Sequence, residues 1–271
     1  MTSALTGQDP DQWKSIDWEK VIRPIHGTLY RLVESQEQIA TRQLLDTLEE
    51  QALLEEMLDA VKPPYPENMA HLHYLLKSPF RYPPLKWGSR FGRTFEPSIF
   101  YGGCSVEVTL VESAYYRFIF WHSMQAPPPK PIMRSVHTLF SVDYKTQKGV
   151  KLQSAPFHQY YDVLRHPSNY SFAQTLGTVM RSQQVEVFEY CSARTTQNQE
   201  KSQDKKLNIR KGICVGLFTA DSFCTNQPKE RQQWFCDMSV DEIIFKAVES
   251  SELIRFPLDQ FLLDGVLPMP A

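Results

Sequence analysis

Hydrophobic positions along this chain of 271 residues recur with a helical period in one part and with a strand period in others. Residues 17–62 have the helical period. It is clearest in residues 39–62, IATRQLLDTLEEQALLEEMLDAVK, where leucines recur every three or four positions above an acidic face. Pro63 and Pro64 end this predicted helix. We interpret it as a packing helix, and a docking surface for a partner is the alternative.

Residues 105–122 predict another helix, for which Ser105 is a suitable N-cap. Glu112 lies within the apolar pattern of this helix, and Tyr116 follows four residues later on the same face. A carboxylate in such a position is costly to bury unless it is paired or used. The core face carries apolar residues at every fourth position: Val106, Leu110, Ala114 and Phe118.

Alternating or apolar runs elsewhere predict strands, and residues 168–183 predict one more helix. Residues 63–103, which are rich in proline and aromatic residues, predict loops and short strands, and the polar stretch 193–211 predicts an exposed loop. Strands broken by a few helices indicate an α+β fold rather than strict βαβ alternation. The predicted strands cover residues 99–101, 135–143, 185–192 and 212–218, and the last two are expected to pair as a hairpin.

Composition argues against several classes of protein. Apolar residues make up 42% of the chain and charged residues 22%, with a net charge of -2, which indicates a globular protein without a surface for nucleic acid or acidic membranes. The chain has no signal-like start and no apolar run of membrane length, so we expect a cytoplasmic protein. Five scattered cysteines and seven dispersed histidines indicate reduced, buried thiols and no metal site.

The stretch from Phe80 to Arg117 concentrates the candidate chemistry. Arg90 sits in a Gly-Ser-Arg-Phe-Gly turn, Tyr101 precedes two glycines, and Glu112 follows on the helix. A cation, an aromatic face and a carboxylate together suit a ligand with phosphates, a flat ring and a developing positive charge, such as NAD. Each side chain also has a plain structural interpretation, as a turn arginine, a core tyrosine and a surface glutamate.

The same stretch, with others, carries a family resemblance. RYPPLKWGSRFG, IFYGG and VTLVESAYYRF occur in order, followed by YSFAQTLGTVMRSQQVEVFEYCSAR and KGICVGLFTADSF. Over roughly residues 75–225 the chain resembles the RES-domain family of bacterial toxins, whose antitoxins are Xre-like helix-turn-helix proteins. The resemblance implies a helical N-terminal extension over residues 1–70 and a RES domain over residues 71–271. It also implies an ADP-ribosyltransferase-like mixed sheet that binds NAD in a cleft.

The implied activity is cleavage of the nicotinamide–ribose bond of NAD, by an NAD glycohydrolase or an NAD phosphorylase. Two further possibilities stay open: a protein ADP-ribosyltransferase, and a catalytically inactive module that only binds its partner. No dinucleotide-binding GxGxxG or Walker A pattern occurs, so NAD is expected as a substrate, with no cofactor. The expected partners are NAD and an Xre-like antitoxin that carries the DNA binding, and the oligomeric state, a homo-oligomer included, is left open.

The functional positions of the family map onto Arg90, Tyr101, Glu112 and Ser192, with Tyr116 as a further contact. Glu112 would stabilise an oxocarbenium-like centre, and Arg90 would bind pyrophosphate or orient the ribose. Tyr101 would stack on nicotinamide, and the Ser192 hydroxyl would bind phosphate or the nicotinamide amide. Arg81 is also expected to bind substrate. Arg81 and Arg93 compete with Arg90 for the role of the cation, and Glu96 and Glu107 compete with Glu112 for that of the carboxylate.

Overall fold

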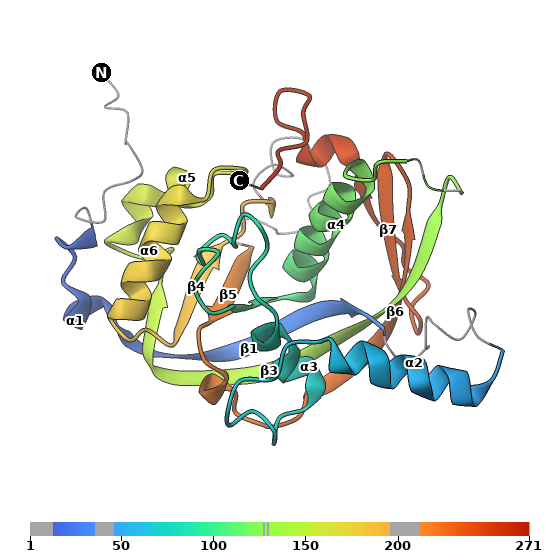
Figure 1. The fold of residues 1–271 in the computed structure, drawn as a ribbon. Helices are drawn as coiled ribbons and strands as arrows, with labels where there is room; N and C mark the ends of the chain where they lie inside the picture. Colours follow the sequence, from blue (N-terminus) through green and yellow to red (C-terminus); the bar gives the residue numbers. More distant parts are fainter. Residues whose placement is uncertain (1–12, 36–45, 127, 129, 196–211, 271) are drawn as a thin grey trace.

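The computed structural model describes residues 13–35, 46–126, 128, 130–195 and 212–270. Within these residues, eight strands form one mixed sheet in the order β1-β2-β5-β4-β3-β6-β7-β8 (Figure 1). This confirms the predicted α+β class. The strands are β1 (Arg23–Glu34), β2 (Phe100–Gly103), β3 (Met133–Lys151), β4 (Val187–Cys191), β5 (Ile213–Leu217), β6 (Glu230–Met238), β7 (Glu242–Ala247) and β8 (Ile254–Pro257).

The helices lie against this sheet and at its ends. They are α1 (Trp18–Val21), α2 (Leu48–Ala60), α3 (Tyr74–Arg81), α4 (Val106–His122), α5 (Tyr161–Leu164) and α6 (Ser171–Ser182), with 3-10 turns at Phe157–Tyr160, Ala220–Ser222 and Leu258–Phe261. The helices predicted over residues 105–122 and 168–183 are confirmed as α4 and α6. The Ser105 hydroxyl caps α4 by accepting a hydrogen bond from the Val108 N–H at 3.3 Å.

Strand β1 closes part of the sheet into a ring, because it pairs with both β2 and β3. Tyr30 of β1 lies opposite Gly103 of β2 on one side, and on the other side β1 runs antiparallel to β3 from Arg23 to Glu34. Strands β2, β5, β4 and β3 complete the ring through their own pairings. The apolar core inside it includes Leu29, Phe100, Phe140, Val187 and Val215, together with Leu75 and Leu76 of α3.

The helical prediction for residues 17–62 is wrong for residues 23–34, which form β1. Ile25, Leu29, Leu32 and Val33 recur at helical spacing, yet the strand places them on both of its faces. Ile25 and Leu29 are buried in the core of the ring, and Leu32 packs on the cluster beneath α4. A strand that is covered on both faces can therefore show the apolar spacing of a helix. Here pairing with the distant β3 makes the segment a strand. The predicted domain boundary at residue 70 stays a prediction.

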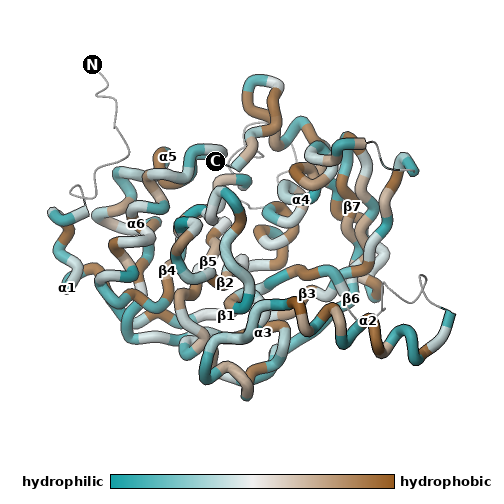
Figure 2. Tube along the Cα trace, in the orientation of Figure 1, coloured by the Kyte–Doolittle hydropathy of each residue, from teal (hydrophilic) through white to brown (hydrophobic). Residues whose placement is uncertain are grey.

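Helix α2 forms where a helix is predicted, but its interpretation as a packing helix is wrong. Thr47 and Glu50 form a capping box at its start, and residues 36–45 lie outside the described part. Leu48 is 72% exposed and Val61 80% exposed, and among the residues of α2 only Gln51 is buried. Figure 2 shows hydrophobic (brown) and hydrophilic (teal) residues alternating along α2, which lies at the rim of the molecule. The second interpretation, a docking surface, stays a prediction.

Three smaller expectations also need correction. The loop predicted within residues 63–103 contains α3, whose Leu75 and Leu76 enter the core. The exposed loop predicted over residues 193–211 begins with the buried residues 193–195, and the rest lies outside the described residues. Among the cysteines, Cys224 is exposed although buried thiols were expected. The hairpin of β4 and β5 is confirmed as an antiparallel pair.

No helix in the described ranges combines the length and the apolar character needed to cross a membrane.

The exposure of α2 predicts how the protein responds to truncation of two leucines. Leu48→Ala is expected to change the free energy of unfolding by less than about 0.5 kcal/mol, because a surface side chain loses few contacts. Leu76→Ala, at a fully buried position, is the matched comparison and is expected to lower it by about 2–5 kcal/mol. Urea unfolding of both variants measures this. Equal losses would mean that α2 packs on the body of the protein.

Candidate functional site

A cavity of about 540 Å³ opens beside α4 and is lined by residues from β1, β2, α4 and the segment that joins α3 to β2. Arg90, Tyr101, Glu112 and Tyr116 all line it. Four of the predicted site residues, which span 27 positions of sequence from residue 90 to residue 116, are therefore brought to one cavity. Ser192, from the other half of the chain, reaches the same place through its contact with Glu112.

Arg90 is buried, at 9% exposure, and its guanidinium is held on two sides. Its Nη1 donates hydrogen bonds to the backbone carbonyls of Leu164 at 3.2 Å and His166 at 2.9 Å. The guanidinium carbon lies 4.5 Å from the centre of the Tyr170 ring. Burial alone disfavours the charge of Arg90, but Tyr170 and Glu112 nearby outweigh it and raise the pKa of Arg90 above its usual value. The cation is fixed in place and stays charged.

Glycines allow the backbone of the Arg90 turn to pack closely. Gly88 has a φ of +74°, and a Cβ there would meet the Gly92 carbonyl oxygen at 2.3 Å. Gly177 of α6 lies on the other side, where a Cβ would meet the Phe91 carbonyl oxygen at 1.8 Å. The α6 backbone thus packs directly on the residue after Arg90. Such close approach of two backbones is available only to glycine.

Tyr101 supports the same turn from β2. Its hydroxyl accepts a hydrogen bond from the Phe91 N–H at 3.1 Å and lies 3.0 Å from the Ser89 Oγ. Burial raises the pKa of Tyr101 to about 12, so the hydroxyl stays protonated at neutral pH. The Tyr101 ring stands at 83° to the ring of Tyr190, with the ring centres 6.2 Å apart. Tyr101 therefore joins β2 to the turn that carries Arg90, in addition to lining the cavity.

Glu112 and Ser192 are in direct contact, since the Ser192 hydroxyl donates a hydrogen bond to Oε1 of Glu112. Ser192 is fully buried, and its Oγ also accepts a hydrogen bond from the Arg194 N–H at 3.0 Å. Its carbonyl accepts two hydrogen bonds from Arg165, at 2.8 and 2.7 Å. Among the described residues, no hydrogen bond reaches Oε2 of Glu112. One carboxylate oxygen is thus held, and the other is available to a ligand.

Tyr116 lies one turn further along α4 and lines the cavity at its solvent side, with 46% of its surface exposed. Its ring packs edge-on against that of Tyr115, with the centres 5.1 Å apart. This position suits contact with a bound ring rather than a role in the core.

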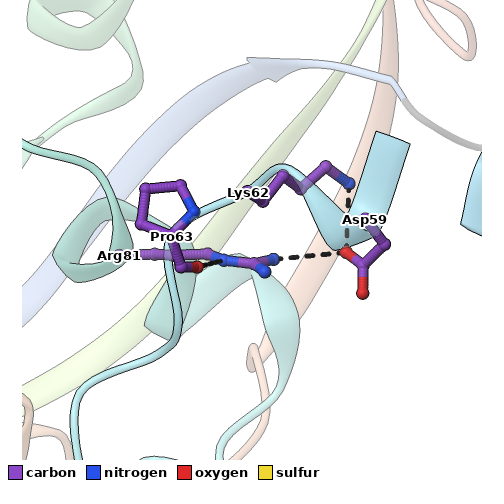
Figure 3. Close-up of polar contacts among 4 residues, drawn as sticks. All are labelled: Asp59, Lys62, Pro63 and Arg81. Atoms are coloured by element: carbon purple, nitrogen blue, oxygen red, sulfur yellow. Dashed lines mark hydrogen bonds and ion pairs between the residues drawn. The ribbon is translucent and has the colours of Figure 1, made fainter. Parts of the chain in front are cut away.

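Arg81, predicted to bind substrate, is not brought to the cavity. Figure 3 shows its side chain directed toward the end of α2. Nε donates to the Pro63 carbonyl, Nη1 lies 3.4 Å from the Asp59 carboxylate, and the guanidinium lies over the Tyr65 ring at 4.3 Å. Arg81 therefore joins α3 to α2 and the segment that follows it.

Arg93, Glu96 and Glu107 lie outside the cavity lining as well. Arg93 donates from Nη2 to Thr175 at 3.2 Å, and its N–H donates to the Glu96 carboxylate at 2.8 Å. Glu96 accepts a further hydrogen bond from Thr178, so Arg93 and Glu96 attach the segment before β2 to α6. Glu107 is exposed on the first turn of α4. The cation and the carboxylate of the cavity are therefore Arg90 and Glu112 rather than these neighbours in sequence.

Three residues that the sequence pattern did not indicate contribute to the site. Arg31 of β1 lines the cavity, Tyr170 stacks under Arg90, and Arg165 holds the carbonyl of Ser192. Arg31 and Tyr170 stand neither in a turn nor inside an apolar helix, the two settings in which a charge or a ring is noticeable in sequence. Tyr170 lies in a segment with serines and an asparagine that also fits a plain helix start, so only the tertiary contact identifies it.

The family model described as RES domain matches residues 66–238. This chain belongs to the RES domain family. The RES match includes Arg90, Tyr101, Glu112 and Ser192, whereas β1 with Arg31 precedes it.

A solved structure, the M. tuberculosis MbcT–MbcA toxin–antitoxin complex, is similar to this RES-domain chain at 9% sequence identity. The comparison covers 82% of this chain and 89% of that chain, with a TM-score of 0.45. No curated protein matches the sequence.

The hydroxyl of Tyr101 is expected to matter for stability, because it satisfies a backbone N–H at the Arg90 turn. Tyr101→Phe keeps the ring but leaves the Phe91 N–H without its partner, which is expected to lower the free energy of unfolding by about 1–3 kcal/mol. The control is Tyr116→Phe, at an exposed position, with an expected change below about 0.5 kcal/mol. Chemical denaturation compares them. A Tyr101→Phe protein as stable as wild type would contradict this role.

Proposed function

We propose that this RES-domain protein binds NAD as a substrate and cleaves its nicotinamide–ribose bond. One observation carries the proposal: the Glu112 carboxylate, held by a buried serine, lines the same aromatic cavity as the fixed Arg90 cation. A carboxylate and a cation in one tyrosine-lined cavity match the two charges of such a reaction, which are the developing positive charge on the ribose and the negative charge of the phosphates.

Glu112 is assigned the central chemical role. Loss of nicotinamide leaves positive charge on the anomeric carbon and ring oxygen of the ribose, as in glycoside cleavage. A preorganised carboxylate stabilises that charge without having to reorient during the reaction. The hydrogen bond from Ser192 to Oε1 supplies the orientation, and Oε2 is left to face the ribose or one of its hydroxyls. Ser192 acts here by positioning Glu112, beyond the ligand contact expected from the sequence.

Arg90, Tyr101 and Tyr116 are assigned to binding. Arg90 uses Nη1 for two backbone carbonyls, so its other N–H groups remain for a charge-assisted hydrogen bond to the ribose or pyrophosphate. The tyrosine rings offer flat apolar surface for nicotinamide. Because these contacts exist before the bond breaks, they contribute mainly to substrate affinity.

The acceptor of the ADP-ribosyl group is water or phosphate in this proposal, which corresponds to a glycohydrolase or a phosphorylase. Product analysis after incubation with NAD, with and without inorganic phosphate, distinguishes the two. Free ADP-ribose identifies water as acceptor, and ADP-ribose phosphorylated at its anomeric carbon identifies phosphate. Label transferred from NAD to protein would instead favour an ADP-ribosyltransferase, and no loss of NAD would favour an inactive partner-binding module.

The family resemblance further supports a role as the toxin of a toxin–antitoxin pair in the cytoplasm. We expect an Xre-like antitoxin to cover the opening of the cavity and to carry the DNA binding, since the net charge of this chain, -2, does not favour DNA. A helix-turn-helix protein encoded beside this chain, added at equal concentration, should abolish NAD consumption. NAD consumption that continued in the presence of bound partner, or tight DNA binding by this chain alone, would contradict this arrangement.

Glu112→Gln is the sharpest test of the chemistry. It keeps the size of the side chain and an acceptor for Ser192 but removes the charge, so turnover is expected to fall about 10²-fold or more while NAD affinity changes far less. Glu107→Gln, on the exposed face of the same helix, is the matched control and should retain wild-type turnover. In cells, wild-type expression should lower NAD and arrest growth, whereas Glu112→Gln should be tolerated. A folded Glu112→Gln protein with full turnover would remove Glu112 from this role.

A further inference from the structure

The segment that joins α5 to α6, residues 165–170, lies beside Arg90 and makes most of the contacts that fix it. Nη1 of Arg90 donates to the carbonyl of His166 in this segment and to that of Leu164 just before it. Tyr170, at the end of the segment, places its ring against the guanidinium. The position of the Arg90 cation therefore depends on the shape of the 165–170 segment.

The imidazole ring of His166 holds this segment in its bent shape. Its Nδ1 accepts hydrogen bonds from the N–H of Ser168 at 3.3 Å and from the N–H of Asn169 at 2.9 Å. These residues stand two and three positions after His166, where an N-cap side chain also finds its donors. Pro167 disfavours the helical region for the residue before it, which suits such a cap. Because both partners are donors, Nδ1 carries no proton, and the proton of the neutral ring is on Nε2.

The capped segment is connected to its surroundings at two further points. The Asn169 side-chain oxygen accepts a hydrogen bond from the N–H of Ser171 at 3.0 Å, at the start of α6. The Pro167 carbonyl accepts one from Nη2 of the buried Arg194 at 2.9 Å. A change of shape at His166 would therefore also reach the start of α6 and the segment that carries Arg194.

A histidine cap differs from a serine or asparagine cap because it can take up a proton near neutral pH. Partial burial and the positive charge of Arg90 lower the pKa of His166 below its ordinary value of 6.5. The folded protein thus favours the neutral ring, so the two hydrogen bonds to Nδ1 are complete above pH 6.5 and are lost as the pH falls through the lowered pKa.

Other charged and titratable groups lie on the elements around this segment. Arg165 directs its donors to the Ser192 carbonyl, and Arg194 directs Nη2 to Pro167 and to the Tyr170 hydroxyl. On α5, Asp162 is exposed, and Tyr161 lies under the Arg165 guanidinium. Of these groups and Arg90, it is Arg90 that acts on the charge of the His166 ring.

We propose that His166 is a positioning residue for Arg90, and that a proton on its Nδ1 releases the segment that fixes the Arg90 guanidinium. The inference rests on the proposed function, in which Arg90 binds an anionic substrate, and adds a pH-dependent control of that binding.

Protonation of His166 acts on Arg90 in two ways. Nδ1 can no longer accept, so the N–H groups of Ser168 and Asn169 lose their partner and the backbone around the His166 carbonyl is free to move. The ring also gains a positive charge close to the Arg90 guanidinium, which repels it. Both effects displace Arg90 from the place in which it contacts a ligand, so acid pH is expected to weaken the binding of an anionic ligand.

Two substitutions separate the cap from its titration. His166→Asn keeps a side-chain acceptor that reaches the same two N–H groups and does not titrate, whereas His166→Ala removes the acceptor. His26→Asn, at an exposed position on β1, is the control for the loss of a histidine. Calorimetry measures the affinity of each protein for ADP-ribose from about pH 8 to about pH 5, the range in which histidine titrates.

The wild-type protein is expected to lose affinity about fivefold or more toward the acid end, the scale of one hydrogen bond. His166→Asn should match wild type at the alkaline end within about twofold and then stay flat. His166→Ala should be weakened about fivefold already at the alkaline end. His26→Asn should keep the wild-type profile. In the ligand-free protein, NMR signals of the Ser168 and Asn169 amides should follow the titration in wild type and not in His166→Asn.

A His166→Asn protein whose affinity falls with pH as in wild type would overturn the proposal, because another group would then carry the proton. A wild-type protein with a flat profile, or one that does not bind ADP-ribose, would overturn it as well. So would a His166→Ala protein with full affinity at the alkaline end, because Arg90 would then keep its place without the cap. Failure of the proposed function has a separate signature, a wild-type protein that shows the expected profile for ADP-ribose but leaves NAD intact.

Discussion

The double pairing of β1, with β2 on one side and β3 on the other, is the constraint on which the site depends. It closes five strands into a ring, so β2 cannot move away from β5 and β4 without breaking several ladders at once. Tyr101 is carried by β2, and Ser192 directly follows β4. Side chains from distant parts of the sequence therefore meet at a fixed separation, as preorganised catalysis requires.

Each charged side chain of the cavity has some polar atoms that are hydrogen-bonded within the protein and others that are left for a ligand. Ser192 takes one oxygen of Glu112, and two backbone carbonyls take Nη1 of Arg90. Each charged group keeps part of its hydrogen-bonding capacity on the cavity side. Such half-satisfied charges are costly in an empty cavity and favourable in an occupied one, which is typical of a binding site and unusual for a core.

The structure also separates stabilising arginines from ligand-facing ones. Arg81 and Arg165 direct their donors to backbone carbonyls, and Arg81 also approaches the Asp59 carboxylate. Arg31 and Arg90 line the cavity with donors to spare. Arginine content alone would not distinguish them, because the same planar fork suits a carbonyl, a carboxylate and a phosphate. What distinguishes them is the acceptor that the fold places within reach.

The sequence by itself determined the features that depend on residues near one another in the chain. The cap of α4 at Ser105 and the period of α6 follow from residues close together in the chain. Arg90, Tyr101 and Glu112 were identified because turn, glycine pair and helix are all local signals. Only the tertiary structure decided the rest. Strand β1 has an apolar spacing that also fits a helix, and the exposure of α2 depends on what the rest of the chain leaves uncovered. Pairing of β1 with distant strands places Arg31 in the cavity, and packing of α3 beside the end of α2 places Arg81 against Pro63. A local sequence pattern contains no signal for either contact, because both depend on tertiary structure.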